Sequence, residues 1–180
     1  MLTLRTRHQE LVPDENRRTV WRLHESEEEI DTSSVALLLC DVWDSHWCRG
    51  AVERLEGMIP RMDRTVSAAR SAGISIIHAP SGTIGEYKDS PARHRILEAS
   101  PVEPTESEYA DPSLPVDDSD EGSDTGETEM CQPWRSQHPG IQIDPDLDVI
   151  SDNGKEIYSF LHARKIETLL ILGVHTNMCI

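Results

Sequence analysis

Two stretches of this sequence decide its fold: VALLLCD at residues 35–41 and TLLILGVHTNMC at residues 168–179. Each begins with a continuous apolar run of strand length, which is typical of a strand buried on both faces of a parallel sheet. The first run ends at Asp41, and the second continues into a turn that leads to Cys179. The run ISIIHA at residues 74–79 predicts a further buried strand between them.

Helical patterns separate these strands. Between the first two, apolar residues recur at steps of three or four, at Leu55, Met58, Met62, Val66 and Ala69. Because proline suits a first helical turn better than an interior, Pro60 predicts a break near residues 58–60. Shorter helices are expected at 91–98 and 154–164, with another strand at 148–150. The alternation predicts a three-layer, Rossmann-like α/β fold in which helices cover both faces of a parallel sheet.

The chain divides into an N-terminal arm at residues 1–34 and one domain at residues 35–180. Residues 19–23 of the arm alternate polar and apolar side chains, as a short edge strand would. Residues 100–130 hold eleven acidic residues and no Lys or Arg. This Pro-, Ser- and Glu-rich composition predicts a disordered acidic insertion, with a solvated loop without a binding role as the plain alternative.

Composition excludes several functions. The net charge is -16 at pH 7, and no basic stripe is present to hold a phosphate backbone, so nucleic-acid binding is not expected. No apolar run approaches 18 residues, so we expect neither a membrane span nor membrane binding. Residues 1–18 lack the apolar core of a secretory signal, and the four cysteines form no CxxC pair. A cytoplasmic location with reduced thiols is therefore expected.

Cys179 is the first candidate for chemistry. It follows a buried strand at a point where a helix can begin, and the positive end of a helix dipole would lower the pKa of its thiol. Backbone N–H groups of the same turn can hold an oxyanion. The alternative is a small cysteine that only fills space in the core.

Taken together, ALLLCD at residues 36–41 and TLLILGVHTNMC resemble the isochorismatase-like cysteine hydrolase superfamily, which includes nicotinamidase and N-carbamoylsarcosine amidohydrolase. The resemblance spans residues 35–180 apart from the acidic insertion. It implies that Asp41 is the general base and Cys179 the nucleophile. It also implies a cis peptide bond between Val174 and His175, an oxyanion hole made by the N–H groups of His175 and Cys179, and no cofactor. A carboxylate that merely caps a loop is the alternative for Asp41.

The sequence departs from this family at its lysine. The family closes its third strand with Lys, whereas the strand at 148–150 is followed by Ser151 and Asp152. Lys155 is the best substitute and is taken as the third catalytic residue, although an exposed lysine in a first helical turn is an equal alternative. Without a cation at Cys179, Asp152 would oppose thiolate formation by like charge.

Other polar and aromatic residues are candidates for the substrate pocket. Trp43 and His46 follow the first strand, and His78 ends the second. Core packing is the alternative for Trp43, and a hydrogen-bonded structural role is the alternative for His78. Asp44 and His46 have the spacing of two metal ligands but lack further ones, so no metal is expected.

The residues and the resemblance lead to one functional expectation with two alternatives. We expect a cysteine-dependent hydrolase that cleaves a C–N bond of a small amide-like substrate through an acyl-enzyme. The alternatives are an isochorismatase-type vinyl-ether hydrolase and a catalytically degenerate binding or scaffold protein of the same fold. A homo-oligomer is compatible with the family. Because family members continue past the nucleophile, we expect this sequence to be truncated after Cys179.

Overall fold

The computed structural model describes residues 1–105, 123–176 and 179–180. It forms two compact units, Met1–Thr32 and Ser33–Ile180. Most of the predicted acidic insertion, residues 106–122, lies outside the described residues.

The first unit is an antiparallel hairpin of strands β1 (Leu2–Pro13) and β2 (Thr19–Ile30). The register runs unbroken from the pair Leu2 and Ile30 to the pair Pro13 and Thr19. The predicted arm therefore contains two long strands, of which the expected piece at residues 19–23 is only a part. Leu11, Trp21 and Leu23 fall on one face of this hairpin and are at least half exposed.

The second unit contains a parallel sheet of four strands. These are β3 (Val35–Cys40), β4 (Ser75–Ala79), β5 (Val149–Ile150) and β6 (Thr168–Gly173), in the order β5-β4-β3-β6. Every pairing in the sheet is parallel, and β3 lies between β4 and β6. This confirms an α/β fold built on a parallel sheet, as the three apolar runs predict.

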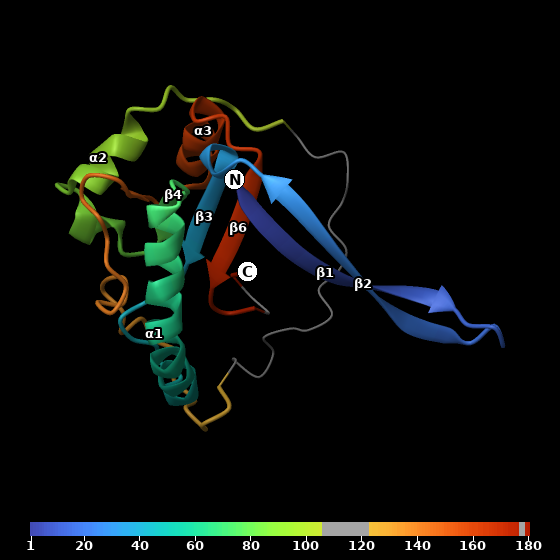
Figure 1. The fold of residues 1–180 in the computed structure, drawn as a ribbon. Coiled ribbons are helices and arrows are strands. Elements are labelled where there is room, and N and C mark those ends of the chain that lie inside the picture. Colours follow the sequence, from blue (N-terminus) through green and yellow to red (C-terminus); the bar gives the residue numbers. More distant parts are fainter. Residues whose placement is uncertain (106–122, 177–178) are drawn as a thin grey trace. The chain divides into compact units, whose positions relative to one another are not determined.

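Three helices flank the sheet: α1 (Arg49–Ser71), α2 (Pro91–Leu97) and α3 (Gly154–Ala163), with α1 running alongside β4 (Figure 1). Two short 3-10 helices, η1 (Thr32–Ser34) and η2 (Ile84–Tyr87), precede β3 and α2. Helix α2 begins at Pro91 as predicted, and Ser90 caps it by accepting a hydrogen bond from the backbone of Arg93 (3.1 Å).

The predicted break in the first helix is wrong, because α1 passes through Pro60 without interruption. A proline inside a helix removes one hydrogen bond and costs roughly 3 kcal/mol. Here Pro60 is exposed, while buried residues on both sides of it hold the helix against the core: Leu55, Ile59, Met62 and Val66. Packing of this face outweighs the local preference. The face of α1 that packs on the core contains Ile59 and not the predicted Met58, which is 41% exposed.

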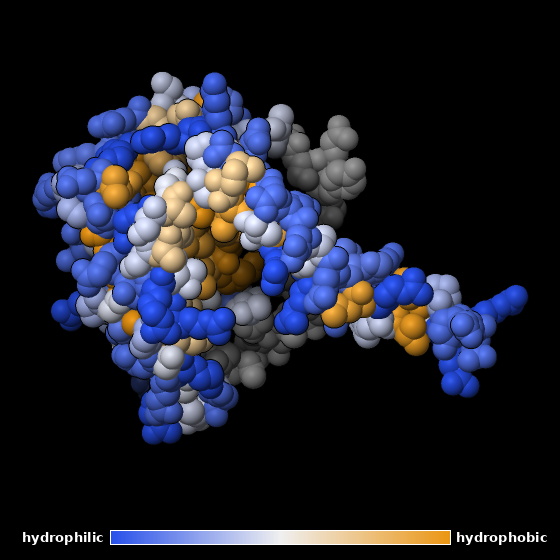
Figure 2. All heavy atoms as spheres, in the orientation of Figure 1, coloured by the Kyte–Doolittle hydropathy of each residue, from blue (hydrophilic) through white to orange (hydrophobic). Residues whose placement is uncertain are grey.

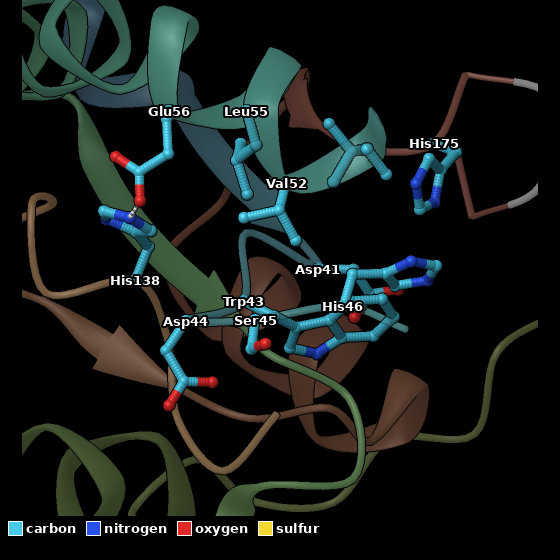
Figure 3. Close-up of a pocket in the computed structure, with 12 residues that line it drawn as sticks. Asp41, Trp43, Asp44, Ser45, His46, Val52, Leu55, Glu56, His138 and His175 are labelled. Carbon is cyan, nitrogen blue, oxygen red and sulfur yellow. Dashed lines mark hydrogen bonds and ion pairs between the residues drawn. The ribbon is translucent and has the colours of Figure 1, made fainter. Parts of the chain in front are cut away.

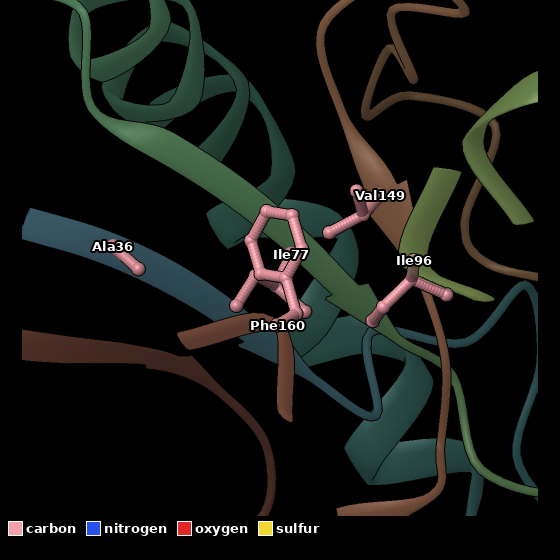
Figure 4. Packing of buried hydrophobic residues seen from close by; sticks show 5 residues of the cluster. All are labelled: Ala36, Ile77, Ile96, Val149 and Phe160. Carbon is pink, nitrogen blue, oxygen red and sulfur yellow. The ribbon is translucent and has the colours of Figure 1, made fainter. Parts of the chain in front are cut away.

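The core joins the sheet to α2 and α3. Ala36 of β3, Ile77 of β4 and Val149 of β5 pack with Ile96 of α2 and Phe160 of α3 (Figure 4). All five side chains are at most 5% exposed. At about 25 cal/mol per Å² of apolar surface, such burial is the main stabilising contribution to the fold.

The second unit also exposes apolar surface beside α1, over the sheet (Figure 2). Among the described strands, β6 is an edge strand, and its Leu169 and Ile171 are 39% and 51% exposed. No helix of the described residues is both long enough and apolar enough to cross a membrane.

Residues 123–127, at the end of the predicted acidic insertion, dock on the first turn of α1. The Thr125 hydroxyl accepts a hydrogen bond from the backbone of Gly50 (3.0 Å), and Asp124 forms an ion pair with Arg54 (2.6 Å). The backbone N–H of Arg49 faces Glu127, so one carboxylate and one hydroxyl lie at N–H groups that a helix leaves unpaired at its N-terminus.

Candidate active site

Asp41 lies at the carboxyl end of β3, where the ladder of the sheet ends. Its backbone N–H still donates to the carbonyl of Ala79 (3.1 Å), but its φ of 52° turns the chain out of the strand. This left-handed conformation is uncommon for a residue other than glycine and often marks a functional position. The backbone of Ser81 donates to Asp41 Oδ1 (2.8 Å), so the carboxylate is fixed in one orientation and is 3% exposed.

Cys179 reaches the same point from the end of β6. Its thiol lies close enough to the Asp41 carboxylate and to the backbone N–H of His175 for the two to shift its pKa in opposite directions, while the side-chain hydrogen bond to Asp41 Oδ2 comes from the Cys40 thiol (3.8 Å). The thiol of Cys40 donates to the Cys179 carbonyl (3.4 Å). The structure therefore brings together Asp41 and Cys179, which the sequence places near opposite ends of the domain.

The predicted lowering of the Cys179 pKa is wrong. Burial and the adjacent Asp41 carboxylate raise the pKa of this thiol to about 11, and they outweigh the His175 N–H, which lowers it. Burial and Asp41 likewise raise the pKa of Cys40 to about 12. Both cysteines are therefore neutral thiols at pH 7.

The peptide bond between Val174 and His175 is cis, as the resemblance implies. The backbone of Val174 donates to the Cys40 carbonyl (3.1 Å), which anchors the turn to the end of β3. Of the two N–H groups expected in an oxyanion hole, that of His175 lies beside the Cys179 sulfur.

A pocket opens in front of Asp41, between the end of the sheet and the first turns of α1 (Figure 3). Trp43, His46 and His175 line the side near Asp41, and His138 and Glu56 line the other side. The enclosed space is about 10 Å³, enough for one water molecule. A substrate must therefore displace side chains to enter.

Aromatic rings crowd the mouth of this pocket. Trp43 stacks on Trp134 with ring centroids 4.3 Å apart, and His46 stacks on Trp134 at 5.4 Å. The edge of His175 meets His46 at 4.9 Å. The indole N–H of Trp43 donates to the Ser81 carbonyl (3.1 Å), which fixes this ring, whereas that of Trp134 is buried without a partner among the described residues.

The two imidazoles of this group are neutral at pH 7. Burial and then the charge of nearby Arg54 lower the pKa of His175, although Asp41 opposes this. Burial and His175 lower the pKa of His46. Neutral rings can stack and accept protons but supply no positive charge.

The predicted pocket residues separate into two groups. Trp43 and His46 line the pocket, whereas His78 does not. His78 pairs with Leu39 and Ile150, one row inside the edge of the sheet, and is fully buried. Its ring lies 2.7 Å from the side chain of Gln137 and 3.0 Å from that of Asp148. This is the structural role that the sequence left open.

The structure does not place Lys155 at the pocket. Its ammonium group pairs with Glu103 (2.8 Å), its side chain is 68% exposed, and it does not line the pocket. Ser151 bonds to Glu156, and Asp152 accepts from the backbone of Gly82 (2.9 Å). Within the described residues, the charge that opposes the Cys179 thiolate comes from Asp41 and not from Asp152.

Several site residues were missed by sequence reasoning. Trp134 and His138 lie in a segment without helix or strand, and Glu56 lies on a solvent-facing stretch of α1. The His138 ring meets Glu56 (3.2 Å), and its backbone donates to the Val42 carbonyl (2.7 Å). Only the presence of tryptophan and histidine next to an acidic, Pro-rich stretch hinted at a contact.

The described residues contain no group of three or more His, Cys, Asp and Glu side chains placed to hold a metal ion. Asp44, the other half of the possible metal pair, accepts instead from the backbone of Arg135 (2.9 Å) and the hydroxyl of Ser136 (3.2 Å). It joins the loop after β3 to the segment that carries Trp134.

No protein-family model matches this chain, and a search of curated proteins finds no significant match either.

Proposed function

We propose that this chain is a cysteine hydrolase of the isochorismatase-like superfamily, with a three-layer Rossmann-like domain, acting on a C–N bond of a small amide. The observation that carries the proposal is that the Cys179 thiol and the buried Asp41 carboxylate lie together at the carboxyl edge of a parallel sheet. Ligand chemistry in such sheets gathers at that edge. The strained backbone of Asp41 at the same point supports a functional role.

The proposed reaction uses Asp41 as general base. As the Cys179 sulfur attacks the amide carbon, its proton passes to Asp41 and a C–S bond forms. The oxyanion faces the backbone N–H of His175. Protonated Asp41 then gives its proton to the leaving nitrogen as the C–N bond breaks. Water, deprotonated by Asp41, hydrolyses the thioester and restores the thiol.

The resting site is not primed with a thiolate. The pKa of about 11 keeps Cys179 protonated, and no Lys or Arg of the described residues contributes to that pKa. Proton transfer to Asp41 must accompany attack, so we expect a slow enzyme compared with one that holds a cation at the thiol. The same observation favours a second candidate, a binding protein of this fold that has lost catalysis.

A panel of small amides distinguishes the two candidates. Release of ammonia or amine is measured for the wild type, for Cys179→Ala and for Cys131→Ala, the control, because Cys131 is exposed as Cys179 is. The hydrolase predicts turnover that Cys179→Ala abolishes and Cys131→Ala preserves, with an acyl adduct on Cys179 seen by mass spectrometry. Binding of an amide without turnover or adduct would instead establish the binding protein.

A further inference from the structure

The electrostatics of the pocket identify a class of ligand. Three carboxylates line it, those of Asp41, Asp44 and Glu56, and its lining contains no Lys or Arg. His46 and His175 are neutral at pH 7 and do not offset this charge. A negative ligand would therefore meet like charges in a confined space, while a positive ligand would meet opposite ones.

The nearest guanidinium does not reverse this balance. Arg54 lies close enough to lower the pKa of His175, but it does not line the pocket. The Arg54 guanidinium pairs with the Asp124 carboxylate through two contacts, at 2.6 Å and 3.4 Å. His138 is held by Glu56 at 3.2 Å, and that carboxylate remains 60% exposed.

The aromatic rings at the mouth favour the same kind of ligand. Trp43 lines the pocket together with Asp41 and Asp44, Trp134 stacks on Trp43, and an indole face attracts an ammonium or quaternary ammonium group. In this structure the rings cover one another, and only about 10 Å³ is enclosed. The indole N–H of Trp43 is anchored to Ser81, whereas that of Trp134 has no partner among the described residues, so only Trp43 has a side-chain hydrogen bond that must break if its ring moves.

We propose that the pocket binds a small amide that carries a positive charge, with its ammonium group between the Trp43 indole and the Glu56 carboxylate and its carbonyl toward Asp41, beside which the Cys179 thiol lies. This rests on the proposed function for the orientation of the carbonyl. The preference for a cation over an anion rests on the lining residues alone.

Three probes of similar size test the preference. Betaine amide is a cation, 3,3-dimethylbutanamide is its neutral isostere, and malonamate is an anionic amide. Their binding to the full chain carrying Cys179→Ala, which prevents turnover, is measured by titration calorimetry, with tryptophan fluorescence as a second signal. We expect betaine amide to bind on the order of 10-fold more tightly than its isostere, with malonamate weakest, and the advantage to shrink as salt is raised.

A matched pair of variants assigns the effect to the pocket. Glu56→Gln, made in the same background, is expected to weaken betaine amide by roughly 5-fold and leave the neutral isostere unchanged. Glu53→Gln removes an equal charge from the same helix, where Glu53 is paired with Arg49 outside the pocket, and is expected to change neither.

The outcomes separate this inference from the hydrolase proposal. Equal or tighter binding of the isostere or of malonamate, or no binding of any probe, overturns the cation preference. If the wild type hydrolyses only neutral or anionic amides, the inference falls and the hydrolase stands. If betaine amide binds with the expected preference but no amide is ever turned over, the hydrolase falls and the ligand class stands.

Discussion

The Cys179 thiol lies beside Asp41, whose carboxylate accepts from the backbone of Ser81 at Oδ1 (2.8 Å) and from the Cys40 thiol at Oδ2 (3.8 Å). Asp41 therefore has two opposed effects. It raises the pKa of the thiol at rest, and it is also the acceptor for the proton that the thiol must lose. A variant at this position should separate the two effects.

Asp41→Asn should abolish most of the amide hydrolysis because the amide side chain cannot accept the thiol proton. Loss of a general base costs typically 10²- to 10⁴-fold in rate. Steady-state kinetics checks this, with the exposed Asp89→Asn as a control that keeps its activity. Activity of Asp41→Asn within about 10-fold of the wild type would remove Asp41 from the mechanism.

Asp148 should support the fold and not the chemistry. Although burial opposes it, hydrogen bonds from His78 and Arg70 lower its pKa from 3.8 to about 2. A carboxyl group whose pKa is lower in the folded state than in the unfolded state stabilises the fold at pH values above the unfolded pKa. This stabilisation, about 2 kcal/mol, is lost as the pH falls from about 4 to about 2.

Asp148→Asn should lower the free energy of unfolding at pH 7 by about 3 kcal/mol, because Arg70 and His78 lose their buried partner. Urea unfolding measures this, and the exposed Asp146→Asn should change it by less than about 0.5 kcal/mol. The difference in free energy of unfolding between the wild type and Asp148→Asn should become smaller toward pH 2. A constant difference between pH 4 and pH 2 would contradict the assignment.

Gly50 should be required for residues 123–127 to dock on α1. A Cβ at Gly50 would collide with the Asp124 carboxylate and lie 2.9 Å from the Thr125 methyl group. Gly50→Ala is expected to speed cleavage after Glu127 by a glutamate-specific protease several-fold. Gly57→Ala, on the same helix with open space around it, is the control and should add about 1 kcal/mol of stability. Equal cleavage of the two variants would show that the docking is not tight.

Pro60→Ala should stabilise the domain. It restores a backbone N–H inside α1 at an exposed position, and we expect a gain of about 1–2 kcal/mol in urea unfolding. Pro91→Ala, at the first turn of α2 where proline is favourable, should give no gain. A destabilising effect of Pro60→Ala would mean that α1 relies on a bend at this point.

The parallel sheet could be predicted from the sequence because its main strands are continuous apolar runs. Residues 35–40 and 168–173 match β3 and β6 without adjustment. The position of Asp41 and Cys179 at one edge follows from that topology, since parallel strands end together. By contrast, the continuity of α1 through Pro60 depends on packing, which a local rule cannot include.

The remaining parts of the site could not be predicted because they depend on contacts between distant segments. Sequence distance alone favours Lys155, yet its ion-pair partner is Glu103. Trp134 stacks on Trp43 because contacts such as that of Asp44 with the backbone of Arg135 join two segments far apart in the sequence. The pKa of Cys179 cannot be predicted from its sequence neighbours, because burial and Asp41, which is distant in the sequence, raise it.

The most direct test of the account is the pH dependence of alkylation at Cys179, followed by iodoacetamide labelling and mass spectrometry in the wild type and in Asp41→Asn. The wild type should show a midpoint near the pKa of about 11. Asp41→Asn, which removes the charge that raises this pKa, should move the midpoint to lower pH while hydrolysis is lost. A midpoint that stays the same or rises in Asp41→Asn would show that the carboxylate and the thiol do not interact, and the proposed active site would fail.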